Sequence, residues 1–361
     1  MDTGGERSAP VLLDPAGRGI LTAMVSTDRD AALGLLAARA MLDRLDAMTA
    51  RADGVRRAED IEDVHQMRVA SRRLRAALAL FEPVLPARRV EGWVKDVRRV
   101  TRRLGEARDL DVQIAFVEDF TRRHTEHAAW QPGLRRLLLR LRQRRERVQP
   151  RLRAAMDRFG DSDIETELGA ALRQLTALGH MAQADEHSEA VFERARDTVR
   201  ARVQEVVSFA DEARDPTHTE QAHALRIAAK RLRYTLEVFA PAFDGALRPY
   251  IQIVKRLQTV LGEVHDCDVW IDWLPRFLDD ERRRTVRFYG AARDFRKILG
   301  GIEALREDRR ARREQLFARF LRLWDATYAD RTWPALVALV DEAAARDDRS
   351  ATAVPAGEPA P

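Results

Sequence analysis

The sequence predicts an all-α protein in which two similar helical bundles follow one another along the chain. Apolar residues recur at spacings of three and four through most of the 361 residues, and no alternating strand pattern of useful length appears. A stretch at 65–81, HQMRVASRRLRAALALF, occurs again in altered form at 223–239, HALRIAAKRLRYTLEVF. Charged residues make up 34% of the chain and aromatic residues only 6%, a composition that suits long amphipathic helices.

The first repeat is expected to cover about residues 28–180, after a flexible segment at 1–27 that is rich in glycine, proline and polar residues. Gly105 is expected to end one helix as its C-terminal glycine, and Asp109 to open the next as its N-cap. The helices predicted in this repeat lie at 30–51, 61–82, 90–104, 109–123, 134–159 and 164–178.

The second repeat, about 186–346, follows the same order, so that each repeat holds about five to six helices. LGEVHDCDV at 261–269 matches LGEARDLDV at 104–112. Such a repeat predicts pseudo-two-fold symmetry, in which matched elements near the axis face each other. The tail at 347–361, rich in alanine and proline, is expected to be disordered. Helices are predicted at 189–209, 223–239, 250–261, 302–323 and 333–345.

Each copy of the repeated stretch carries a basic stripe along one side of its helix. At helical pitch, about 100° per residue, four basic side chains fall in one sector, and the apolar residues gather in another. Like charges stacked in this way repel, and neither copy has a carboxylate inside its basic sector. Interleaved carboxylates or an anionic ligand must therefore offset the repulsion. The stripes are His65, Arg68, Arg72 and Arg75, and His223, Arg226, Lys230 and Arg233.

The overall charge balance shows that any basic site arises from local clustering. The formal net charge is only +5, because 58 acidic residues nearly balance 63 basic ones. Most of the basic residues are arginines, whose planar fork suits phosphate oxygens. The single cysteine, Cys267, excludes an internal disulfide and indicates a reducing compartment. No signal peptide and no run of roughly 20 apolar residues is found, so we expect a soluble, cytoplasmic protein without a membrane partner.

These motifs in combination resemble the CHAD domain, the conserved-histidine α-helical domain, over about residues 30–345. The resemblance rests on the HxxRVAxRRLR helix, the LGExRDxDV segment and the tandem duplication. It implies two similar helical bundles around a basic central channel, and binding of inorganic polyphosphate, often at polyphosphate granules. The predicted polyphosphate-binding residues are His65, Arg68, Arg72, Arg73, Arg75, Arg98, Arg102, Arg108, Arg145, His223, Arg226, Lys230, Arg231, Arg233, Lys255 and Arg313.

The chain departs from the family pattern in two places. His265 of the second repeat stands where the first repeat has Arg108, so an arginine is replaced by a histidine at this position. Many relatives also carry a CYTH triphosphatase domain, and no segment of that kind is present here. We therefore expect no catalytic residue, no metal ion and no cofactor.

Several of these residues also have purely structural interpretations. A single basic stripe is most often a solvated helix face, although its recurrence favours a ligand, and a histidine beside it can be structural or ligand-binding. The paired aspartates of the two LGExxDxD segments could hold a metal, but helix capping and pairing with arginine explain them better, because a hard cation needs more converging oxygens. They are Asp109, Asp111, Asp266 and Asp268.

The sequence thus predicts a polyphosphate-binding protein without catalytic activity of its own. A nucleic-acid-binding protein is the first alternative, but the stripes hold almost no aromatic residues on which bases could stack. A magnesium-dependent enzyme that processes polyphosphate or triphosphate is the second. It would need a glycine-rich phosphate loop or a cluster of metal-binding carboxylates, and we find neither. A helical adaptor remains if the stripes are only solvated.

Overall fold

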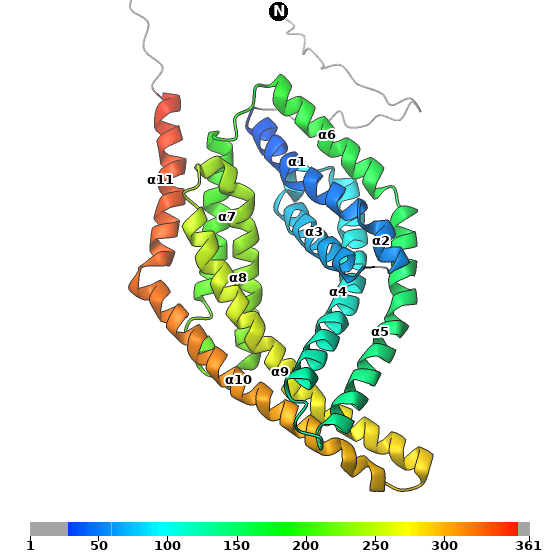
Figure 1. Ribbon diagram of the computed structural model, residues 1–361. Helices are drawn as coiled ribbons and strands as arrows, with labels where there is room; N and C mark the ends of the chain where they lie inside the picture. Colours follow the sequence, from blue (N-terminus) through cyan, green and yellow to red (C-terminus); the bar gives the residue numbers. More distant parts are fainter. Residues whose placement is uncertain (1–27, 59, 353–361) are drawn as a thin grey trace, which may run out of the picture.

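A computed structural model describes residues 28–58 and 60–352, and within this range the regular structure is helical, without strands (Figure 1). The predicted all-α class is therefore confirmed. The predicted flexible segment at 1–27 and residues 353–361 of the predicted tail lie outside the described residues. The helices are α1 (Asp28–Thr49), α2 (Ala52–Arg57), α3 (Ile61–Leu80), α4 (Ala87–Arg123), α5 (Gln131–Gly160), α6 (Ile164–Met181), α7 (Glu189–Val207), α8 (Thr219–Phe239), α9 (Arg248–Tyr289), α10 (Arg296–Ala329) and α11 (Thr332–Thr352).

The contacts between helices follow the same order in the two halves. In the first half, α1 packs on α3 and α6, α3 packs on α4, and α4 packs on α5. In the second half, α7 packs on α8 and α11, α8 packs on α9, and α9 packs on α10. Each of these contacts in one half therefore has a counterpart in the other. The two-fold rotation expected to relate the halves stays a prediction.

The halves meet along the two helices that carry the repeated stretch. Helix α3 contacts α8, and the pairs α1–α7 and α5–α10 also join the halves. The rings of Phe81 and Phe239, which end the two stretches, lie 6.4 Å apart between centroids. One large apolar core runs through both halves, and a second cluster joins the far ends of α4, α5, α9 and α10. The packing therefore fixes α3 against α8.

The predicted helix breaks at Gly105 and after Leu261 are wrong. Helix α4 continues through Gly105 to Arg123, and α9 continues through Gly262 to Tyr289. Asp109 consequently lies inside a helix and is not an N-cap. Gly105 lies between Leu104 and Ala107, both fully buried, and neither interior glycine has a positive φ. Burial of the apolar face along the whole helix thus outweighs the cost of about 1 kcal/mol for a helical glycine.

The described part of the chain contains no helix long and apolar enough to cross a membrane. At the C-terminal end, α11 extends to Thr352, beyond the expected boundary at residue 346.

Candidate functional site

The basic side chains of α3 and α8 approach each other across the contact between the halves. Burial, followed by the charges of Arg72, Arg226 and Arg75, lowers the pKa of Lys230 from 10.5 to about 8. Burial also lowers the pKa of Arg75, to which the charges of Arg98 and Arg72 contribute. Such effects require short distances between the charges. Cations that are far apart in the sequence are therefore gathered in one place.

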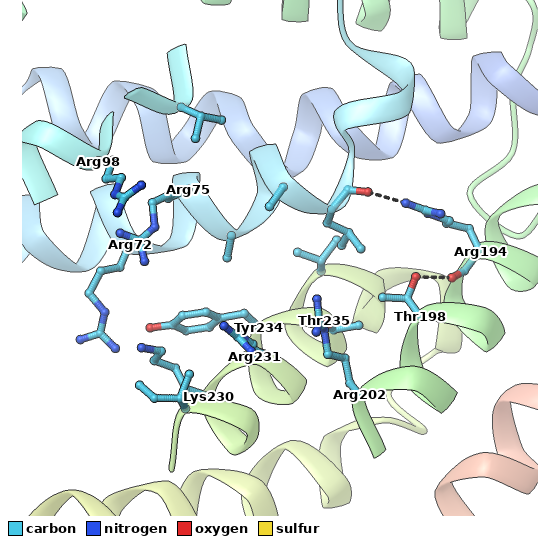
Figure 2. A pocket seen from close by; sticks show the side chains of 16 residues that line it. Arg72, Arg75, Arg98, Arg194, Thr198, Arg202, Lys230, Arg231, Tyr234 and Thr235 are labelled. Carbon is cyan, nitrogen blue, oxygen red and sulfur yellow. Dashed lines mark hydrogen bonds between the residues drawn. The ribbon is translucent and has the colours of Figure 1, made fainter. Parts of the chain in front are cut away.

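A cavity of about 620 Å³ lies between α3, α4, α7 and α8, and we call it the basic cavity. All of the cations named above except Arg226 are among its lining residues. Figure 2 shows the side chains of Arg72 and Lys230 extending beside the ring of Tyr234. No carboxylate is among the described residues that line it. Its charged lining consists of Arg72, Arg75, Arg98, Arg194, Arg202, Lys230 and Arg231, and the remainder is apolar apart from Thr198, Tyr234 and Thr235.

Several of these cations have no counter-charge in direct contact. Among the described residues, the side chains of Arg72, Arg75, Arg98 and Lys230 make no hydrogen bond or ion pair. Two other lining residues are paired, because Arg231 binds Glu205 and Arg202 binds the same carboxylate at 2.8 Å. The unpaired group thus lies on α3, α4 and α8. These cations repel one another, and a bound anion would neutralise their charge.

Carboxylates of neighbouring helices lie close to the part of each stripe that follows its histidine. Arg68 pairs with Asp109 of α4 at 3.2 Å. Burial lowers the pKa of Arg226, and Asp266 of α9 is the carboxylate that opposes this shift most strongly. Asp109 and Asp266 occupy the same position of the two LGExxDxD segments. Their expected pairing with arginine is therefore confirmed for Asp109, and the stripes are compensated along only part of their length.

The histidines of the two repeats differ in their surroundings. His223 Nδ1 lies 3.3 Å from His265 Nδ1, on α9. Burial, followed by the charges of Arg226 and His223, lowers the pKa of His265 to about 4, so that this ring is neutral at physiological pH. In the first repeat, His65 Nδ1 is buried without a hydrogen-bond partner. The replacement of an arginine by His265 therefore creates a histidine pair that the first repeat lacks.

Besides Arg68, five predicted residues have partners outside the basic cavity. Arg73 and Arg233 both reach Glu237, at 3.5 Å and 3.3 Å. Because Glu237 follows Arg233 by four residues on the same face of α8, the expectation that the second basic sector holds no carboxylate is wrong. Arg102 pairs with Glu106 at 3.3 Å. The remaining two occupy equivalent places in the two halves: Arg145 binds Asp111 at 2.7 Å, and Arg313 binds Asp268. These contacts are typical of structural ion pairs.

Two further predicted residues also lie away from the lining. Lys255 of α9 is exposed, and its side chain has no charged partner among the described residues. Arg108 acts electrostatically on Arg68 and Asp109, so it lies near the end of the first stripe.

The cavity has a wall from α7 that sequence reasoning missed. Arg194 donates a hydrogen bond to the carbonyl oxygen of Leu80 at 2.9 Å, which ties α7 to the end of α3. Arg194, Thr198 and Arg202 all line the cavity. Their spacing of four residues places them on one face of a helix. This spacing could have identified a polar face on α7 from the sequence, although α7 carries no copy of the repeated stretch.

Comparisons with known proteins agree with this architecture. The model of the CHAD domain matches residues 39–275, a range that includes α3 and α8. The crystal structure of the CHAD domain from the plant Ricinus communis has a TM-score of 0.52 and 24% identity, and the match covers 81% of this chain and 94% of that one. This structure supports the fold.

Two curated relatives are uncharacterized proteins of Mycobacterium tuberculosis, from the strains CDC 1551 and H37Rv. Each is 28% identical over 218 residues, which is 59% of this chain and 40% of the relative. The chain thus spans about two fifths of the length of these relatives. Because the domain model covers more than half of the chain and the fold agrees, this protein belongs to the CHAD domain family.

Proposed function

We propose that the protein binds inorganic polyphosphate in the basic cavity. The observation that carries the proposal is the convergence of Arg72, Arg75, Arg98 and Lys230, whose side chains have no counter-charge in direct contact within the described residues. A folded chain that keeps like charges together without neutralising them gains free energy when an anion enters. The ligand should therefore be strongly anionic and able to meet several cations at once.

A linear chain of phosphates has these properties. Each internal phosphate carries about one negative charge, and a hydrogen bond to a charged group contributes about 1.5–3 kcal/mol net. The arginine guanidinium matches pairs of phosphate oxygens with its planar fork. A run of cations can bind such a chain without recognising a base or a sugar. Association with polyphosphate granules in the cytoplasm is the corresponding cellular role that we propose.

The lining of the cavity favours polyphosphate over nucleic acid. Proteins that bind single strands stack the bases on exposed aromatic rings. Tyr234 is the aromatic residue among the described lining, and it is only 9% exposed. It offers little surface for stacking.

The lining also favours binding over catalysis. Phosphoryl transfer commonly uses magnesium held by carboxylates. The described lining contains no carboxylate. Asp109, near the end of the first stripe, is already paired with Arg68. We therefore propose a binding protein without enzymatic activity.

A competition experiment tests this function. Fluorescently labelled long-chain polyphosphate is titrated with the protein at physiological salt, with single-stranded DNA, duplex DNA and orthophosphate as competitors. We expect polyphosphate to bind most tightly and its affinity to fall linearly on a logarithmic salt scale, through counterion release. Preference for either DNA would contradict the proposal. Release of orthophosphate from polyphosphate in the presence of Mg²⁺ would instead show an enzyme.

A further inference from the structure

A second group of potential ligands lies in the turn between α4 and α5, away from the basic cavity. His124, Glu126 and His127 converge there, with one ligand atom from each lying within 4.8 Å of the others. Helix α4 separates them from Arg98 by roughly 40 Å, at 1.5 Å per residue. The proposed polyphosphate site therefore does not involve this turn, and the three residues require a separate explanation.

The distances between the ligand atoms fit a transition-metal site. His124 Nδ1 lies 3.7 Å from Glu126 Oε1, and His127 Nε2 lies 3.4 Å from the same oxygen. Nitrogen and oxygen ligands at about 2.0–2.2 Å from a tetrahedral zinc ion are separated by about 3.3–3.5 Å. Two of the three separations thus lie within a few tenths of an ångström of the required values. Small rotations of partly exposed side chains would bring the two imidazoles to a common ion.

Packing around the turn limits both imidazole rings to small rotations. The His127 ring stacks on Trp130 with centroids 3.9 Å apart, and the His124 ring contacts Phe120 at 4.5 Å. Gln131 donates a side-chain hydrogen bond to the carbonyl oxygen of His124 at 3.0 Å. Phe120 is fully buried in the second apolar cluster, so the rings rest on a rigid base. Orientation of the ligands by neighbouring groups in this way favours metal affinity.

The backbone of α10 also braces the turn. A Cβ atom placed on Gly301 would lie 2.1 Å from the carbonyl oxygen of Trp130, so only glycine permits this approach. A Cβ atom on Gly133 would likewise lie 2.3 Å from the carbonyl oxygen of Ile298. The two helices are therefore in close backbone contact where α5 begins. The turn is held between α4, α5 and α10.

We propose that His124, Glu126 and His127 form a binding site for a late first-row divalent metal ion, with zinc as its simplest probe. Two imidazoles and one carboxylate suit zinc, nickel or copper, whereas magnesium and calcium prefer oxygen ligands. The three ligands leave at least one coordination position for water or another donor. The ion links the end of α4 to the start of α5. This proposal revises the expectation from sequence that the protein holds no metal.

Isothermal titration of the untagged, metal-free protein with ZnCl2 tests the site. We expect one zinc ion per chain, no comparable binding of Mg²⁺, and an increase in thermal stability with zinc. His124→Ala and His127→Ala should each weaken zinc binding at least about tenfold, and Glu126→Gln should weaken it while keeping both imidazoles. Circular dichroism checks that each variant is folded.

His187→Ala provides a matched control. His187 is 44% exposed, as against 46% for His127, and it also lies beside carboxylates. Its Nδ1 faces Asp185 at 3.2 Å, whereas its Nε2 faces Asp244 at 3.3 Å. Because these carboxylates lie at opposite ring nitrogens, they cannot join His187 around one ion. Zinc binding should therefore survive this change. Absence of saturable binding, or equal binding by the His124→Ala/His127→Ala double variant, would overturn the proposal.

Discussion

Two arginine-rich regions of the molecule differ in what neutralises their charge. In the basic cavity, Arg72 and Lys230 have no carboxylate in contact among the described residues. Where α5 packs near α9, Glu281 has a side chain only 1% exposed and receives three arginines. The partners of Glu281 are Arg140 at 2.6 Å, Arg136 at 3.2 Å and Arg284 at 3.2 Å.

The contrast shows that arginine clustering alone does not identify a binding site. Around Glu281 the cations neutralise a buried carboxylate, and their role is to hold helices together. In the basic cavity the corresponding anion is missing from the lining, so it must come from a ligand if the charge is to be neutralised. The same residue type therefore stabilises the fold in one region and is available to a ligand in the other. Four predictions test this distinction.

Charge reversal in the basic cavity should have the largest effect. Arg72→Glu combined with Lys230→Glu should lower the affinity for polyphosphate by about 1000-fold or more, since each charged hydrogen bond contributes about 1.5–3 kcal/mol and 1.4 kcal/mol corresponds to tenfold. The measurement is the polyphosphate titration, with helical content followed by circular dichroism.

The control for this pair changes the same total charge elsewhere. Arg122 and Arg283 are highly exposed and each pairs with an aspartate on its own helix. Arg122→Glu with Arg283→Glu should retain most of the affinity. Equal losses in both double variants would show that net charge, rather than the basic cavity, governs binding.

Removing the buried carboxylate should damage the fold but leave binding intact. Glu281→Gln leaves Arg140 and its neighbours without their counter-charge, which should lower the free energy of unfolding by about 3 kcal/mol. Urea denaturation measures this loss. The affinity of the folded variant for polyphosphate should match that of the unchanged protein. A strong loss of affinity in a folded variant would mean that the Glu281 region contributes to the site.

The affinity for polyphosphate should fall in alkaline solution because of Lys230. Its pKa is about 8 in the free protein, and a bound anion favours the protonated form and raises that pKa. The contribution of Lys230 is therefore complete below pH 8 and is lost as the pH rises above it. We expect roughly a tenfold decrease between about pH 7 and 9.5. Titrations of Lys230→Arg over the same range should show a much flatter profile, and a decrease as large as in the unchanged protein would assign the effect to another group.

The sequence was sufficient to predict the features that depend on local periodicity and on the repeat. Apolar spacing predicted the helical class, and the duplicated stretch identified Arg72, Arg75 and Lys230, which the structure gathers in the cavity. Their spacing on a helix is a local property, so one sequence suffices to read it. The glutamates of the two LGExxDxD segments also pair with arginines: Glu106 with Arg103 at 2.8 Å, and Glu263 with Arg312 at 3.1 Å.

Features that depend on packing between distant segments could not be predicted in the same way. Gly105 was expected to end a helix because local propensity favours that, whereas burial along all of α4 decides the outcome. Arg145 shares its residue type with Arg72, but only the fold places it against Asp111. The contribution of Arg194 likewise depends on where α7 packs. Which arginines are paired is thus a property of the tertiary structure.

The smallest expected effect is a gain in stability when one cavity cation is removed. Lys230 is partly buried and lies near Arg72 and Arg226, so its positive charge lowers the free energy of unfolding. This destabilisation is present below its folded pKa of about 8. The destabilisation disappears as the pH rises from 8 toward 10.5, the ordinary pKa of lysine, because the folded state loses the proton before the unfolded state does. Lys230→Met should therefore raise the free energy of unfolding at neutral pH by about 1 kcal/mol without polyphosphate. Thermal unfolding is measured with and without polyphosphate. Without polyphosphate, the variant should be more stable than the unchanged protein. Polyphosphate should then stabilise the variant less than it stabilises the unchanged protein. A variant that is less stable alone would show that Lys230 supports the fold, as the arginines around Glu281 do.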